Sequence, residues 1–133
     1  MFGNYPVNDD WVFLWQVKAF ASGIFKINAE LDPSFVAQGF LSLLWSKIFG
    51  LDYLSLQVLT FLISLGIAYF VYKTLLMLGS QKIYAVAGAL TLLFNPLFFV
   101  SSFTFMTDNY LLFFCRLQRT FLFVISRSLI SGI

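Results

Sequence analysis

The chain has 133 residues, of which 60% are hydrophobic, 20% are aromatic and only 11% are charged. This composition excludes a disordered tail and an ordinary soluble domain, in which about a quarter of the residues are charged, and it indicates a membrane protein. The formal net charge of +2 predicts no nucleic-acid partner, the absence of histidine excludes a His-based metal site, and the single cysteine, Cys115, excludes an internal disulfide.

Two apolar segments close to the N-terminus are too short or too polar to cross a bilayer. In residues 11–25 and just beyond, three polar side chains fall four apart, on one helical face: Lys18, Ser22 and Lys26. Residues 35–50 repeat this spacing with Gln38, Ser42 and Ser46. All three tryptophans (Trp11, Trp15 and Trp45) lie in these segments, and tryptophan favours the headgroup level of a membrane. We expect two amphipathic helices in the interface plane, with two short buried helices as the alternative.

Two uncharged runs further along are long enough to cross a membrane. The first covers residues 53–72, and these 20 residues extend about 30 Å as a helix, the thickness of a bilayer core. The second covers residues 83–107 and contains Asn95-Pro96 near its middle. Because proline removes one helical hydrogen bond there, we expect a kinked helix.

The last apolar segment, residues 109–126, begins like a third spanning helix but contains Arg116 and Arg119 near its centre. An arginine in the middle of a bilayer costs about 2.5–3.5 kcal/mol, so this helix is compromised as a span. The whole sequence therefore predicts an all-α membrane protein: two interfacial amphipathic helices followed by two to three transmembrane helices. These elements form a single partial membrane domain over residues 1–133, in which residues 1–52 are an external loop.

The charges that flank the predicted spans indicate how the chain crosses the membrane. The loop of residues 73–82 joins the two spans and holds two lysines and no acidic residue. By the positive-inside tendency we place this loop in the cytoplasm, so that the N-terminal region faces outward. Two crossings separate Asp10 from Asp108, which therefore lie on the same side in either orientation. We expect Asp9, Asp10 and Asp108 to be able to meet at one membrane face.

Carboxylates are the acid–base groups that the sequence offers near neutral pH. The motifs Asn8-Asp9-Asp10-Trp11 and Met106-Thr107-Asp108-Asn109 each place them just before an apolar helical run. Helix capping explains either site alone, because Asp and Asn accept backbone N–H bonds there and suit the helix dipole. A shared membrane face favours the other interpretation, in which the carboxylates act as a general base or hold a divalent cation.

The order of these features resembles the amino-terminal part of the GT-C superfamily of integral-membrane glycosyltransferases. That order is an acidic pair, two interfacial helices, a span, a basic loop, a second span and Thr-Asp opening another helix. Residues 40–50 (FLSLLWSKIFG), 51–79 and 95–108 match the style of the family, and the resemblance covers most of residues 5–114. Within the superfamily the chain is most similar to protein O-mannosyltransferases and to the aminoarabinose transferase that modifies lipid A.

The resemblance implies that a sugar is transferred from a polyprenyl- or dolichyl-phosphate donor to an acceptor hydroxyl on the outer membrane face. By match to the family's acidic motif, Asp9 is the expected general base and Asp10 the residue that assists or orients it. Asp108 matches a later acidic site that binds metal or positions the substrate. The candidates for neutralising the donor phosphate are Lys18, Lys26 and Lys47. We expect an integral protein of the plasma (inner) membrane, with its acidic loop facing outward.

The polar C-terminal tail leads us to expect an amino-terminal fragment of such an enzyme, truncated or frameshifted, with little or no transferase activity by itself. Its expected partners are the lipid bilayer and the lipid-linked donor, and its expected cofactor is at most a divalent cation. The alternative is a small non-enzymatic membrane protein, either a transporter part or an assembly subunit. In that case the three aspartates are caps, and Arg116 and Arg119 pair with partners inside a bundle.

Overall fold

The computed structural model describes residues 10–27 and 35–131, and every regular element in this part of the chain is a helix. The prediction of an all-α fold is therefore confirmed. The helices are α1 (Asp10–Ala21), α2 (Phe35–Phe49), α3 (Tyr53–Met77), α4 (Lys82–Leu93), α5 (Pro96–Ser101) and α6 (Thr107–Ser131).

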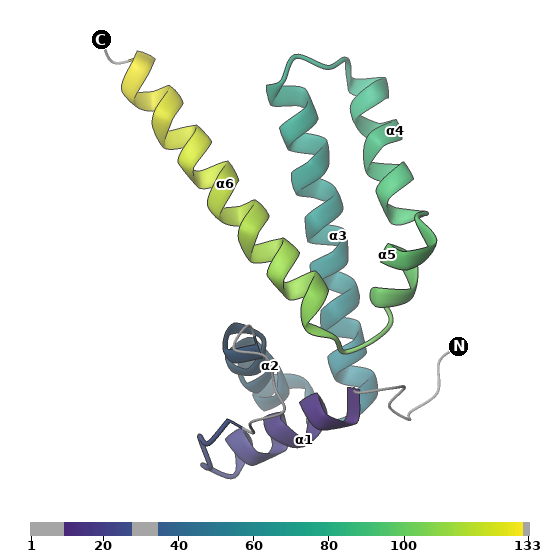
Figure 1. The fold of residues 1–133 in the computed structure, drawn as a ribbon, viewed down its shortest axis with the longest axis vertical. Helices are drawn as coiled ribbons and strands as arrows, with labels where there is room; N and C mark the ends of the chain where they lie inside the picture. Colours follow the sequence, from purple (N-terminus) through teal and green to yellow (C-terminus); the bar gives the residue numbers. More distant parts are fainter. Residues whose placement is uncertain (1–9, 28–34, 132–133) are drawn as a thin grey trace.

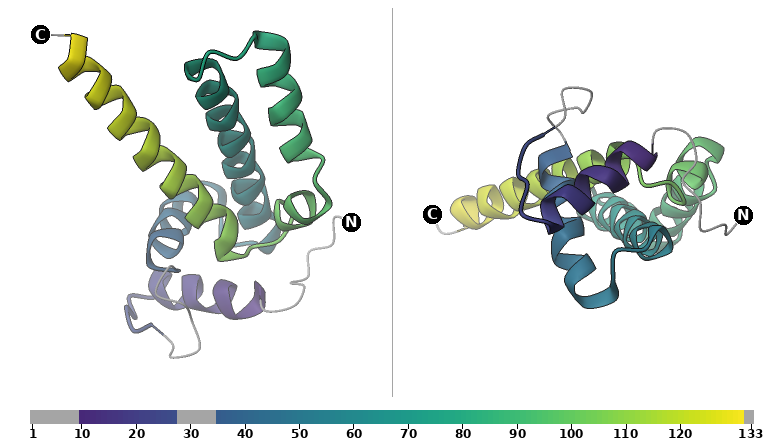
Figure 2. Two further views of the ribbon diagram at one scale, coloured as in Figure 1. Left: turned by 45° about the horizontal axis from the view of Figure 1, so that its top comes forward. Right: turned by 90° about the horizontal axis from the view of Figure 1, so that it is seen from below.

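The long helix α3 is the central element of the fold. Helix α4 returns antiparallel beside it to form a hairpin, whereas α6 packs on the N-terminal half of α3 and then diverges from it (Figure 1). Helices α1 and α2 pack together at the N-terminal end of α3, as both views in Figure 2 show. Because α4, α5 and the following turn bring the chain back toward this end, the starts of α1, α3 and α6 gather at the base of the hairpin.

The run predicted as the first span forms α3, which continues past residue 72 to Met77. Among the described residues, α3 is the helix that is long and apolar enough to cross a membrane. It ends where Gly79 adopts a φ of 86°, and the N–H groups of Gly79 and Ser80 donate to carbonyls in the last turn of α3. Glycine adopts this left-handed conformation without steric cost. Since the helix stops at glycine, Lys73 lies within α3 and the predicted loop of residues 73–82 is shorter than expected.

The run predicted as the second span is not one kinked helix, and this expectation is wrong. It forms α4 and, after a break, α5. The side chain of Asn95 caps α5, with Oδ1 accepting the N–H groups of Leu97 at 3.0 Å and Phe98 at 3.3 Å. Pro96 takes the first helical position, where its missing N–H costs nothing and its fixed φ suits a helix start. Asn95-Pro96 therefore begins a new helix, and the 12 residues of α4 extend only about 18 Å.

The third predicted helix is present and longer than expected. Helix α6 runs unbroken from Thr107 to Ser131, beyond the predicted range of 109–126 at both ends. The two arginines near its centre do not interrupt it, because arginine is a good helix former. Arg116 is half-buried and Arg119 is exposed.

Helix α2 has its polar and apolar faces reversed relative to a helix lying on a water surface. Its polar stripe of Gln38, Ser42 and Ser46 is buried against the protein. Four large apolar side chains lie on its exposed face, Val36, Phe40, Leu44 and Ile48, and Lys47 is exposed beside them. The polar stripe of α2 therefore faces the interior of the protein. Polar side chains packed inside a membrane protein can bond to other segments of the chain, as Gln38 does to the carbonyl of Phe105.

Helix α1 exposes a face of different composition. Trp11, Trp15 and Lys18 are exposed, whereas Val17 and Phe20 are buried against α2 and the base of the hairpin. Tryptophan and lysine suit the headgroup level of a membrane, as expected for an interfacial helix. The helix ends before Lys26, so this lysine does not share the helical face that its spacing from Lys18 suggests.

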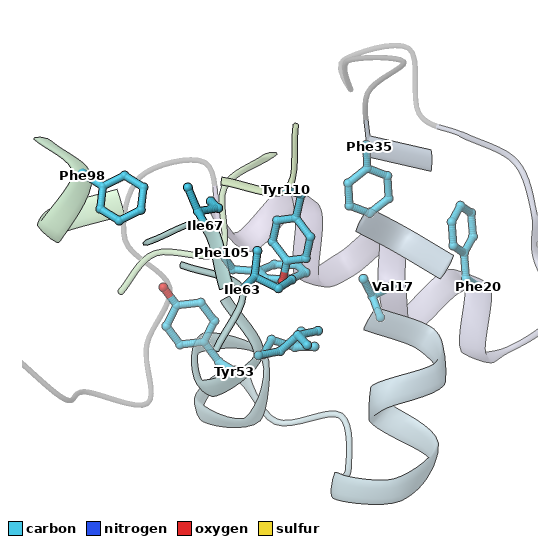
Figure 3. Packing of buried hydrophobic residues seen from close by; sticks show 11 residues of the cluster. Val17, Phe20, Phe35, Tyr53, Ile63, Ile67, Phe98, Phe105 and Tyr110 are labelled. Atoms are coloured by element: carbon cyan, nitrogen blue, oxygen red, sulfur yellow. The ribbon is translucent and has the colours of Figure 1, made fainter. Parts of the chain in front are cut away.

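The core lies where α1, α2 and the start of α6 meet α3. Figure 3 shows Tyr110 and Phe105 beside Ile63, with Val17, Phe20 and Phe35 forming the neighbouring part of the same cluster. The Phe105 and Tyr110 rings meet edge to face, with centroids 6.0 Å apart. Aromatic pairs prefer this geometry, because the edge of one ring is positive and the face of the other is negative. The core therefore joins the N-terminal helices to the hairpin.

Gly39 allows α1 and α2 to approach each other, and we predict that Gly39→Ala destabilises the protein. A Cβ atom at this position would lie 2.8 Å from a ring carbon of Phe20 and 2.9 Å from one of Phe35, both buried. Overpacking of this kind costs about 1–3 kcal/mol, and thermal unfolding in detergent measures it.

The matched control for this prediction is Gly88→Ala in α4. Its added Cβ would meet only the end of the flexible Leu75 side chain, which can move aside. Alanine also favours a helix over glycine by up to about 1 kcal/mol, so the control is expected to unfold at the wild-type temperature or slightly above it. A Gly39→Ala variant as stable as Gly88→Ala would contradict the packing argument.

Candidate active site

Among the acidic residues that the structure describes, Asp10 is buried, whereas Asp52 and Asp108 are exposed. Asp10 is the first residue of α1 and has no solvent exposure. The hydroxyl of Tyr53, the first residue of α3 and itself only 3% exposed, donates a hydrogen bond to Asp10 Oδ2. Burying a carboxylate is costly unless hydrogen bonds replace its water shell, so this contact from a distant helix is part of what makes the position tolerable. A capping aspartate bonds to backbone N–H groups of its own helix, so capping alone does not explain a hydrogen bond from a side chain 43 residues away.

The position of Tyr53 is set by the corner between α2 and α3. Trp45 of α2 donates its indole N–H to the carbonyl and to the hydroxyl oxygen of Ser55, each at 3.0 Å. The N–H of Leu56 donates to the carbonyl of Asp52 at 3.2 Å and closes the first turn of α3. Asp52 is the N-cap residue of α3, but its side chain makes no capping bond. The first turn of α3 is thus tied to α2 through Trp45, and Tyr53 reaches Asp10 from that corner.

The predicted site residues are placed differently from one another. Asp9 lies outside the described residues. Asp108 lies in the first turn of α6 and is exposed. Both α1 and α6 start at the base of the hairpin, but they are anchored at different heights: Asp10 contacts Tyr53, whereas Tyr110 contacts Thr60. Seven helical residues correspond to about 10 Å along α3, so the two helix starts lie in one region but at different heights.

Buried uncharged polar residues beside Asp108 form a network that the sequence analysis did not identify. Asn109 Nδ2 donates to Ser64 Oγ at 2.9 Å, and Asn109 Oδ1 accepts from Ser101 Oγ at 3.1 Å. The hydroxyls of Tyr110 and Thr60 are 3.0 Å apart. Thr60 and Ser64 are four residues apart within an apolar run, and this spacing was the available signal, since it places two hydroxyls on one face of α3. The network fixes the first turn of α6 against α3.

Two glutamines hold the turn that leads into α6. Gln38 of α2 donates to the carbonyl of Phe105 at 3.4 Å, and Gln57 of α3 donates to the carbonyl of Phe103 at 2.8 Å. A loop within a core needs such partners, because its backbone carbonyls have none from a helix. The buried polar stripe of α2 therefore helps to position the chain just before Asp108.

A metal-binding arrangement is not formed by the residues that the structure describes. No group of three or more His, Cys, Asp or Glu side chains that could hold a metal ion is found among them. The lysines considered for the donor phosphate are all exposed: Lys18, Lys26 and Lys47. Their exposure leaves all three available, and the geometry does not select one.

These features define the class: an all-α membrane protein in which a buried carboxylate is held at the base of a helical hairpin. The sequence model of the dolichyl-phosphate-mannose-protein mannosyltransferase family matches residues 19–128. The chain belongs to this family of integral-membrane transferases, and the resemblance seen in the sequence is confirmed. The match includes Asp108 and begins after Asp10, so the acidic pair lies ahead of it. Comparisons with curated proteins and with solved structures gave no significant match.

Proposed function

We propose that this chain carries the acidic site of a membrane mannosyltransferase. That enzyme takes the sugar from a polyprenyl-phosphate-linked donor and transfers it to an acceptor hydroxyl at the outer membrane face. The family match over residues 19–128 supports the donor class. The observation that carries the assignment of the site is the buried carboxylate of Asp10, which accepts a hydrogen bond from Tyr53 of α3. Asp10 directly follows Asp9 in the sequence.

In the proposed reaction the Asp9 carboxylate accepts the proton of the acceptor hydroxyl. The oxygen attacks the anomeric carbon of the sugar, and the bond from that carbon to the phosphate oxygen breaks. The polyprenyl phosphate leaves with the electron pair of this bond. Asp10 assists or orients Asp9. Asp108, exposed in the first turn of α6, positions the substrate. An exposed lysine at the headgroup level neutralises the phosphate of the donor.

The test is a transfer assay with two mannose donors. The protein is produced in membranes as its gene encodes it, with any residues that follow position 133 included. Radiolabelled mannosyl polyprenyl phosphate is expected to give a mannosylated acceptor, and nucleotide-linked mannose is expected to give none in membranes depleted of polyprenyl phosphate. A parallel reaction with a chelator tests whether a divalent cation takes part.

Two results would contradict the proposal. Transfer from the nucleotide-linked sugar alone would overturn the donor class. No transfer from either donor would favour the other interpretation, a small membrane protein in which the half-buried Arg116 of α6 pairs with a partner inside a bundle.

A further inference from the structure

The contact between Asp10 and Tyr53 joins the start of α1 to the corner between α2 and α3. Asp10 belongs to α1, whose other described contacts are mainly apolar packing against α2. Tyr53 belongs to α3, whose first turn is bonded to α2 through Trp45 and Ser55. A buried hydrogen bond fixes the direction of the groups that it joins, whereas packing between apolar side chains is not directional. The hydroxyl of Tyr53 therefore has more control over the position of the Asp10 carboxylate than the apolar contacts have.

We propose that Tyr53 is a positioning residue for sugar transfer, acting through Asp10; this inference rests on the proposed function. The proposed function gives Asp10 the role of orienting the base, and the hydrogen bond from Tyr53 holds the Asp10 carboxyl group that performs this role. A reacting group displaced by about 1 Å can slow a reaction about 100-fold, because the reacting atoms no longer align. In this proposal Tyr53 takes no part in the bond changes, and its role is to hold Asp10 so that the base stays aligned with the acceptor.

The experiment compares Tyr53→Phe with Tyr110→Phe in the mannosyl transfer assay. Both tyrosines are buried, 3% and 1% exposed, and each hydroxyl contacts a side chain of another helix. Each variant keeps the buried ring and loses a hydroxyl that bonds to another helix, so both are expected to unfold at a lower temperature than wild type. Tyr53→Phe is expected to lower kcat about 10- to 100-fold with the KM for the donor within about 2-fold. Tyr110→Phe loosens the turn that carries Asp108, so it is expected to raise the KM for the donor and to leave kcat within about 2-fold of wild type.

A double-mutant cycle shows whether Tyr53 acts through Asp10. In an Asp10→Asn background the Tyr53→Phe change is expected to lower kcat by less than about 2-fold, because the carboxylate that it positions is gone. Equal losses of kcat in Tyr53→Phe and Tyr110→Phe would overturn the proposal, since a merely structural hydroxyl explains that result. If Tyr53→Phe lowered kcat in the Asp10→Asn background as much as it does in the wild-type protein, that result would overturn the proposal as well. Absence of transfer by the wild-type protein is a different outcome, which overturns the proposed function and this role together.

Discussion

Asp9→Asn is expected to reduce the rate of mannosyl transfer by about 100- to 10,000-fold, the contribution of a positioned general base. Asparagine has nearly the same shape as aspartate and also caps helices well, so the substitution removes the base while keeping any capping role. The protein is therefore expected to reach the membrane in normal amounts and to unfold at the wild-type temperature. The measurement is kcat with a mannosyl polyprenyl phosphate donor, together with thermal unfolding in detergent.

Asp52→Asn is the matched control for this substitution. It removes the same charge from an exposed carboxylate at the N-cap of α3, where the side chain makes no capping bond. We expect its kcat to stay within about 2-fold of wild type, because an exposed carboxylate without a partner contributes little to the fold. Full activity in Asp9→Asn would show that Asp9 is a cap and not a base. An equal loss in both variants would indicate a general effect of charge at this face.

Phe105→Ala is expected to cause the largest loss of stability, about 3–5 kcal/mol. The Phe105 side chain has no solvent exposure and packs edge to face on Tyr110. Its carbonyl accepts the hydrogen bond of Gln38, so the same residue joins α2 to the turn before α6. Removing the ring leaves a cavity at the junction of α2, α3 and α6. The expected result is a fall of about 10 °C in the unfolding temperature in detergent.

Leu97→Ala provides the comparison for Phe105→Ala. Leu97 lies in α5 with its side chain 84% exposed, and its N–H still reaches Asn95 after the substitution. A change below about 0.5 kcal/mol is expected, because an exposed side chain leaves no cavity. If Phe105→Ala were as stable as Leu97→Ala, the core at the base of the hairpin would not hold the helices together.

The sequence determined by itself the features that depend on composition and local chemistry. Long uncharged runs and the scarcity of charge were sufficient to predict an all-α membrane protein, because only helices and closed barrels satisfy the backbone in lipid. The residue types also placed a helix start within two residues of the observed start at Thr107, since acidic residues such as Asp108 suit the first turn. The family resemblance rested on the order of such features along the chain, which a sequence displays directly.

Local sequence patterns were less reliable where the same pattern is compatible with two different local structures. Asn95-Pro96 fits a kink within a helix and equally the first turn of a new one, and the second is what the structure contains. The stripe of Gln38 and Ser42 fits a water-facing surface and equally a surface packed inside a membrane protein. Spacing shows that these side chains share a face of α2, but it does not show which environment that face meets.

Only the tertiary structure decided which residues surround the acidic site. The Tyr53 hydroxyl reaches Asp10 across 43 residues, and Asn109 reaches Ser64 across 45, and neither pair has a signature in the sequence. Both contacts depend on how α1 and α6 pack on α3. That packing results from the summed shapes of many apolar side chains, because close-packed cores admit few arrangements of rigid helices. Composition thus determined the environment in which the protein folds, and the packing of its helices determined which side chain holds the carboxylate.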